Sequence, residues 1–149
     1  MAKNALPFWE SKTPEEMTEE EWERLCDRCG LCCLHKIEDS DTHEVYYTYV
    51  ACRLLDIESC TCLSYTNRFD LIPNCLKIER REFARIHLLP KTCAYRKVSQ
   101  GEKLDWWHPL ISKNAKTVHQ SGVSVRNKAI PEKNIHPDEI ETCFFFKIQ

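Results

Sequence analysis

Four cysteines crowd into eight positions of the sequence LCDRCGLCCLHK, residues 25–36. They are Cys26, Cys29, Cys32 and Cys33. Two residues between cysteines let the backbone curl so that both sulfurs reach one metal ion, a spacing that zinc knuckles and iron–sulfur loops share. The cluster therefore predicts a metal site, with a redox-active thiol pair and a disulfide staple as the alternatives.

The rest of the chain favours metal over disulfides. Residues 1–17 contain no apolar stretch typical of a secretory signal, and FFF at 144–146 is far shorter than the roughly 20 residues of a membrane span. We therefore expect a cytoplasmic protein with no membrane partner. Thiols stay reduced in the cytoplasm, so ten cysteines there are more typical of metal binding or of chemistry than of structural disulfides.

The opening loop is expected to be only half of a site. A tetrahedral zinc site needs four ligands, and a cubane cluster typically needs four thiolates. Side chains of adjacent residues such as Cys32 and Cys33 usually point apart, and Lys36 stands where a bacterial ferredoxin run has its next cysteine. Later cysteines must therefore fold back onto the loop, and six are present: Cys52, Cys60, Cys62, Cys75, Cys93 and Cys143.

Three segments are predicted to be helical. Residues 11–26 should form a helix that ends near Gly30, because Thr13 and Glu16 have the spacing of a capping box. An apolar stripe favours a second helix over residues 76–88, and a further helical turn is expected over residues 92–101.

Three other segments are predicted to be extended. Residues 43–55 are rich in β-branched and aromatic side chains, which is typical of a strand. Residues 60–63 are expected to pair back onto this strand after a turn. Alternating valines favour an edge strand over residues 122–130.

These signals predict an α+β fold with short strands, several helices and much irregular backbone, organised around a cysteine-rich metal site. The sequence shows no repeat, low-complexity tract or Gly/Ser linker, so we expect a single domain over residues 1–149. Its cysteine core would span residues 26–93, and the C-terminal extension 94–149 would pack on that core.

The order of the motifs adds a resemblance to a known family. CDRCGLCC is followed by CRLL, CLSYTNRF and NC, and this order resembles that of the bacterial CxxCxxCC family of zinc- or iron-chelating proteins. The later stretches LPKTCAYR and DWWHPL are similar to one branch of small family members. The resemblance implies that Cys52, Cys62 and Cys75 are ligands. This chain departs from the family pattern in having Phe69 in place of a proline, a longer gap before Cys75, and the extra Cys60.

The predicted metal ligands are therefore nine cysteines, namely Cys26, Cys29, Cys32, Cys33, Cys52, Cys60, Cys62, Cys75 and Cys93. Cys143 is expected to be a packing residue, since a buried cysteine behaves as a small apolar side chain. Arg68 is expected to donate to a sulfur or a carbonyl near the metal. The sequence leaves the roles of His35 and His108 open.

Three functions fit these residues. The first is a metal-binding protein that chelates zinc or iron through thiolates. The second is an iron–sulfur redox protein or enzyme that holds a 4Fe–4S cluster, and the third is a metal-free thiol-redox protein, although no thioredoxin-like βαβ pattern surrounds the motif. A metal ion is the expected partner, and a protein partner is left open.

No reaction and no nucleic-acid partner are predicted. The sequence contains no phosphate loop, nucleophile elbow or HExxH motif. Residues 77–128 carry 12 Lys/Arg against 4 Asp/Glu, and residues 1–50 carry 5 against 12. We expect the two segments to attract each other, with an anionic partner for the basic segment as the alternative.

The native fold is predicted to depend on metal, because a metal clamp would close long gaps between the cysteines. Treatment with a chelator under reducing conditions should cause a large loss of cooperative thermal unfolding. The melting curve of metal-free protein, verified by elemental analysis, checks this, and a curve identical to that of untreated protein would contradict it.

Overall fold

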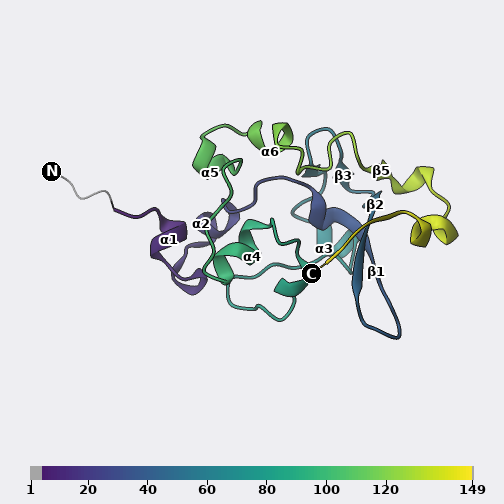
Figure 1. Cartoon of the computed structure of the whole chain (residues 1–149), viewed down its shortest axis with the longest axis horizontal. Helices are drawn as coiled ribbons and strands as arrows, with labels where there is room; N and C mark the ends of the chain where they lie inside the picture. The colour runs from purple at the N-terminus through teal and green to yellow at the C-terminus, as the bar shows by residue number, and fades with distance from the viewer. Residues whose placement is uncertain (1–4, 149) are drawn as a thin grey trace. The chain divides into compact units, whose positions relative to one another are not determined.

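The computed structural model describes residues 5–148 and consists of short helices and strands joined by much irregular backbone (Figure 1). The predicted α+β fold class is thus confirmed. The chain forms two compact units: unit 1 contains the described residues up to 27 and residues 77–117, and unit 2 contains residues 28–76 and the described residues from 118. The single domain over residues 1–149 stays a prediction.

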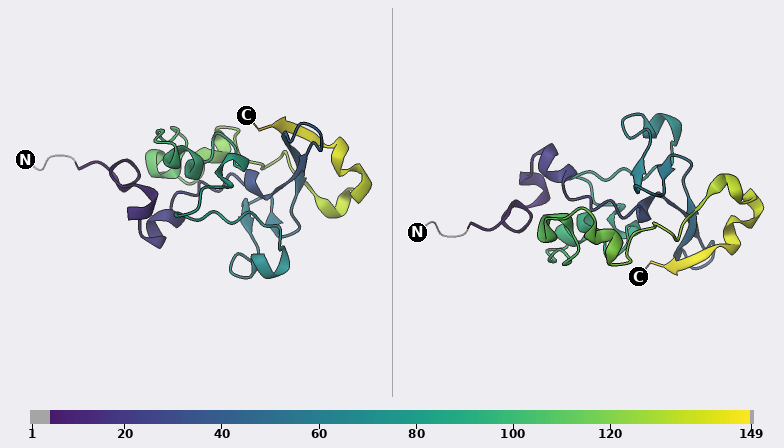
Figure 2. Two further views of the ribbon diagram at one scale, coloured as in Figure 1. Left: turned by 90° about the horizontal axis from the view of Figure 1, so that it is seen from below. Right: turned by 90° about the horizontal axis from the view of Figure 1, so that it is seen from above.

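The main sheet of unit 2 is built around β2, Val45–Ala51. One edge of β2 pairs antiparallel with β1, Leu34–Glu38. The other edge pairs antiparallel with β6, Phe144–Lys147, and in parallel with the short β5, Ile130–Pro131. Figure 2 shows the yellow strand β6 beside the blue strand β2. The predicted strand over residues 43–55 is confirmed by β2, whose residue Tyr47 is completely buried.

A smaller sheet of two strands lies next along the chain. Leu55–Asp56 forms β3 and Thr61–Cys62 forms β4, and the two pair antiparallel with Leu55 opposite Cys62. The expected return of residues 60–63 onto the end of the 43–55 segment is therefore confirmed. Cys60 lies in the turn with a φ of 57°, in the left-handed region that few non-glycine residues adopt.

The prediction of one continuous helix over residues 11–26 is wrong. This segment is divided into a 3₁₀ turn, Pro14–Glu16, and α2, Glu19–Glu23. The expected contact between Thr13 and Glu16 is present, with the Thr13 N–H donating to Glu16 Oε2 at 2.8 Å. The break arises because Thr18 acts as a second N-cap and accepts from the Glu21 N–H at 3.1 Å.

Two buried side chains hold unit 1 together. Trp22 on α2 donates from Nε1 to the Ile78 carbonyl at 3.0 Å, and its ring lies 4.6 Å from that of Tyr95. His108 accepts from the Leu110 N–H at 3.0 Å through Nδ1, so its Nε2–H donates to the Leu25 carbonyl at 2.7 Å. Both ring nitrogens of His108 are thereby used in structural contacts.

Two further sequence expectations are wrong. Residues 76–88 form no α-helix: Glu79 and Glu82 make a β-bridge, and a 3₁₀ turn follows at Ile86–Leu88. The Glu82 carboxylate accepts from the Ala84 N–H at 2.7 Å, a contact that competes with helical backbone bonding.

Residues 122–130 do not form the expected edge strand, since only Ile130 enters β5. The Lys128 and Ala129 N–H groups both donate to the Val125 carbonyl, and Asn127 has a φ of 65°. A turn with a left-handed residue is incompatible with an extended strand.

The predicted helical turn at 92–101 is confirmed by α4, Ala94–Ser99. The other helices are α1 (Phe8–Ser11), α3 (Arg68–Leu71), α5 (Pro109–Ser112) and α6 (Thr117–Gln120), with further 3₁₀ turns at Leu31–Cys33, Glu132–Asn134 and Pro137–Thr142. Across the described residues, every helix is too short or too polar to cross a membrane.

Replacing Gly30 by alanine should destabilise the protein more than replacing Gly101. Both glycines have positive φ, 76° and 73°, so both variants carry backbone strain. A Cβ on Gly30 would also lie 2.7 Å from Val125 Cγ2, whereas a Cβ on Gly101 meets no atom within 4 Å. We expect Gly30→Ala to lower the free energy of unfolding by roughly 1–3 kcal/mol more than Gly101→Ala. Urea denaturation of both variants checks this, and equal losses would contradict it.

Candidate metal centre

The second half of the cysteine motif leads directly into the sheet of unit 2. Gly30 begins the 3₁₀ turn Leu31–Cys33, and its carbonyl accepts from the Cys33 N–H at 3.1 Å. Leu31 is buried and β1 starts at Leu34. The turn therefore fixes the Cys32–Cys33 backbone at the beginning of β1.

Pairing of the first two strands brings a third cysteine to this pair. Leu34 on β1 lies opposite Ala51 on β2, and the next residue, Cys52, donates its N–H to the Cys33 carbonyl at 2.8 Å. Cys33 and Cys52 are thus neighbours although 18 residues separate them along the chain.

A fourth cysteine comes from the loop after α3. The Cys75 N–H donates to the Ile72 carbonyl at 2.9 Å, directly after this helix. The Arg53 guanidinium donates to the Leu71 carbonyl at 2.9 Å, which ties the end of α3 to the residue that follows Cys52. Two points of attachment therefore hold the Cys75 loop within unit 2.

Electrostatic interactions link these four thiols, which we call the thiol cluster: Cys32, Cys33, Cys52 and Cys75. A hydrogen bond to Cys32 raises the pKa of the Cys33 thiol far above its usual range, with burial and the charges of Cys32, Cys52 and Cys75 acting in the same direction. Burial raises the pKa of Cys75, and Cys32, Cys52 and Cys62 add to the rise. Several thiolates in one place repel each other, so the cluster is a site that a cation would stabilise.

Two cationic side chains accompany the thiol cluster. Lys36 lies on β1, where burial lowers its pKa and the charges of Cys32, Cys33, Cys75 and Cys52 oppose that shift. Arg68 on α3 acts on Cys75 and opposes the rise of its pKa.

Within the thiol cluster, the side chains of Cys32 and Cys33 are hydrogen-bonded to each other. Within residues 5–148, no group of three or more His, Cys, Asp or Glu side chains is already arranged to hold a metal ion. Because thiolates are the form that binds metal, a metal bound at these residues would take the place of the thiol protons.

The other cysteines predicted as ligands have different surroundings. In unit 2, the Cys29 carbonyl accepts from the Val125 N–H at 2.9 Å, and Cys62 is half-buried on β4. The buried Cys60 donates to the Ile57 carbonyl at 3.4 Å; burial raises its pKa, while a hydrogen bond to Ser124 and the charge of Arg126 oppose the rise. Cys26 and Cys93 belong to unit 1, where Cys93 is the N-cap of α4.

Cys143 lies in the core, as expected of a packing residue. It is 4% exposed and its thiol donates to the Glu139 carbonyl at 3.4 Å. Its own carbonyl accepts from the Tyr49 N–H at 3.1 Å. This residue therefore provides a buried thiol whose contacts are structural.

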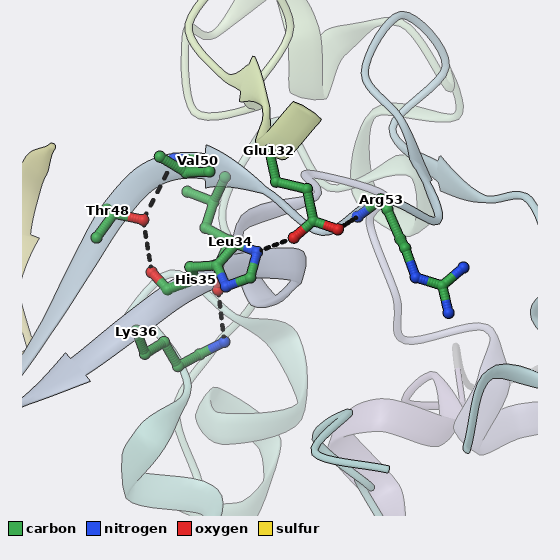
Figure 3. A network of polar contacts seen from close by, with 7 residues as sticks. All are labelled: Leu34, His35, Lys36, Thr48, Val50, Arg53 and Glu132. Atoms are coloured by element: carbon green, nitrogen blue, oxygen red, sulfur yellow. Dashed lines mark hydrogen bonds and ion pairs between the residues drawn. The ribbon is translucent and has the colours of Figure 1, made fainter. Parts of the chain in front are cut away.

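His35 forms a hydrogen bond with Glu132, a contact that the sequence pattern did not predict. Its Nε2 lies 2.5 Å from Glu132 Oε2, and Glu132 Oε1 accepts from the Arg53 N–H at 3.1 Å. Figure 3 shows the His35 ring turned toward Glu132, while the Lys36 ammonium lies near the Leu34 carbonyl. The pair joins β1 to the 3₁₀ turn that follows β5. Sequence spacing carried no signal for Glu132, because it is 97 residues away.

Comparison with known proteins places this chain in a family. A family profile described as "CxxCxxCC: Putative zinc- or iron-chelating domain" matches residues 25–94. A UPF0260 protein of Rhizobium johnstonii is 51% identical over 93% of this chain and 87% of its own length. The chain belongs to the UPF0260 family. The resemblance noted from the sequence is thereby confirmed.

Other UPF0260 proteins match equally broadly. One from Granulibacter bethesdensis is 53% identical over 91% of this chain and 81% of its own length. Another, from Vibrio vulnificus, is 50% identical over 88% of this chain and 90% of its own length. No solved structure matches this UPF0260 chain significantly.

The raised pKa of Cys33 predicts slow alkylation of this thiol in metal-free protein. Only the thiolate reacts, and the pKa of Cys33 lies above the ordinary value of 9.0. Its reaction rate with iodoacetamide should therefore be lower than that of the same residue in urea-unfolded protein at pH 8. The rate should keep rising above pH 9. Site-resolved mass spectrometry measures both rates, and a folded-state rate that levels off below pH 9 would contradict the prediction.

Proposed function

We propose that this UPF0260 protein binds zinc or iron through the thiol cluster, and that the bound metal stabilises unit 2. The observation that carries the proposal is the mutual interaction of Cys33 with Cys32, Cys52 and Cys75. These four cysteines come from three separate segments of unit 2, and soft thiolates are the ligands that zinc and iron–sulfur clusters share.

The donor set fits such a group on chemical grounds. Thiolates that lie close together repel one another, and a metal cation that takes the place of the thiol protons removes this repulsion. Cys32, Cys33, Cys52 and Cys75 would hold the metal, which would supply a link between the start of β1, the end of β2 and the loop after α3.

The wider ligand set remains part of the proposal. Cys62 is the first addition to the thiol cluster, since it acts on Cys75. Cys26, Cys29, Cys60 and Cys93 stay predicted ligands on the strength of their spacing and number. The role of the metal is proposed to be structural or in metal handling, with electron transfer through a cluster as the alternative that the experiment below separates.

Identification of the metal requires anaerobic purification, elemental analysis and a visible spectrum. A colourless protein with about one zinc per chain or more supports chelation of zinc. A brown protein with absorption near ~400 nm and acid-labile sulfide equal to its iron supports a cluster. Protein that contains no metal and takes up neither zinc nor ferrous iron under reducing conditions would refute the proposal and favour thiol-redox chemistry.

Removal of a cluster thiol should lower metal content selectively. Cys52→Ser removes a sulfur from the thiol cluster, so we expect bound metal to fall at least several-fold. Cys143→Ser is the matched control. Cys143 is a buried thiol of the same unit, and its contacts described above are structural. This control should retain the metal content of the unmodified chain. Elemental analysis of both purified variants checks the prediction, and equal metal content would show that the site is misassigned.

A further inference from the structure

Lys36 is held in place by contacts that direct its ammonium group toward the beginning of β1. Its Nζ donates to the Cys32 carbonyl at 2.8 Å and to the Leu34 carbonyl at 3.0 Å. Cross-strand pairing sets Lys36 opposite Tyr47, and Nζ lies 4.7 Å from the centre of the Tyr47 ring. One ammonium group is therefore fixed against two carbonyls and an aromatic face.

This position is unusual for a lysine on a short strand. The side chain is half-buried, and burial disfavours its charge. A lysine that served only solubility would extend into water, where its charge is hydrated. The charges of the thiol cluster oppose this effect of burial, so thiolates there give the Lys36 ammonium an electrostatic partner within unit 2.

Arg68, on α3, supplies a second cation that acts on the thiol cluster. Its guanidinium lies 3.8 Å from the centre of the Tyr65 ring and 4.3 Å from that of Phe69, and it donates to the Tyr65 carbonyl at 2.6 Å. Phe69, the residue that replaces the family proline, is thus one of two rings that hold Arg68. The charge of Arg68 acts on Cys75.

The charges of these groups match those of a loaded thiolate site. Four thiolates around a divalent ion leave two excess negative charges, and an oxidised 4Fe–4S cluster with four thiolates leaves the same excess. Two nearby cations balance that charge in the partly buried environment, where an unbalanced charge is costly.

We propose that Lys36 is a positioning residue that balances the charge of the metal-loaded thiol cluster and sets its metal affinity, with Arg68 in a weaker, second role. This inference rests on the proposed function. Lys36 acts through the thiolates and through the Cys32 carbonyl, whose position it fixes. It differs from a ligand in that the metal should still bind without it, but less tightly.

The test compares three variants with the unmodified protein by chelator competition for zinc and for cobalt. Lys36→Met removes the charge and keeps roughly the length of the side chain. It should lower the affinity for both metals roughly 10–100-fold, as loss of groups that support metal ligands typically does. Lys36→Arg keeps the charge and should retain most of the affinity. Lys147→Met is the control, because Lys147 lies on β6 of the same sheet and pairs with Glu44 at 3.0 Å. It should leave affinity unchanged.

The outcomes separate this inference from the proposed function. An unmodified protein that binds neither metal refutes the proposed function. Tight binding by the unmodified protein and equally tight binding by Lys36→Met would overturn the role of Lys36. Arg68→Met should cause a smaller loss than Lys36→Met, and a larger loss would reverse the assigned order.

A measurement on the unmodified protein covers the case in which Lys36→Met fails to fold. The ¹⁵Nζ resonances of Lys36 and Lys147 are recorded before and after zinc is added. Zinc bound by the thiolates places negative charge next to Lys36 but not next to Lys147. The Lys36 resonance should therefore shift while that of Lys147 stays in place. A Lys36 resonance that does not move on saturation with zinc would overturn the inference.

Discussion

Pairing between β1 and β2 is the interaction on which the candidate site depends. It brings the Cys33 carbonyl to the Cys52 N–H and sets Lys36 opposite Tyr47. The register is irregular between Leu34 and Lys36, and such irregularities change the direction of the side chains around them. His35 contacts Glu132, while its neighbour Lys36 donates to the Cys32 carbonyl. Two polar networks therefore start from adjacent residues of this five-residue strand.

The raised pKa values in the thiol cluster affect the metal-free chain only in alkaline solution. A hydrogen bond to Cys32, burial and neighbouring charges raise the pKa of Cys33, and burial raises that of Cys75. At neutral pH both thiols therefore stay protonated and uncharged, and their repulsion does not lower the free energy of unfolding. In the proposed function, a metal cation would take the place of the thiol protons.

Local chemistry made part of this fold predictable. The aromatic and β-branched run around Tyr47 was sufficient to predict β2. Cysteine spacing, by contrast, did not separate the four cysteines of the thiol cluster from the other predicted ligands. The helix predicted across Thr18 failed because that side chain caps a new helix. The partners of Lys36 and His35 could not be predicted, since strand register and a contact 97 residues away define them.

The order in which the chain is synthesised gives the second edge of β2 a long exposure. β1 precedes β2 and can cover the first edge at once, whereas the other edge waits for Ile130–Pro131 and Phe144–Lys147. Between Ala51 and these strands lie 78 residues before Ile130 and 92 before Phe144, and meanwhile the strand VYYTYVA presents open backbone groups. Such an edge attracts other strands, so nascent chains are the form of this protein most exposed to wrong pairing.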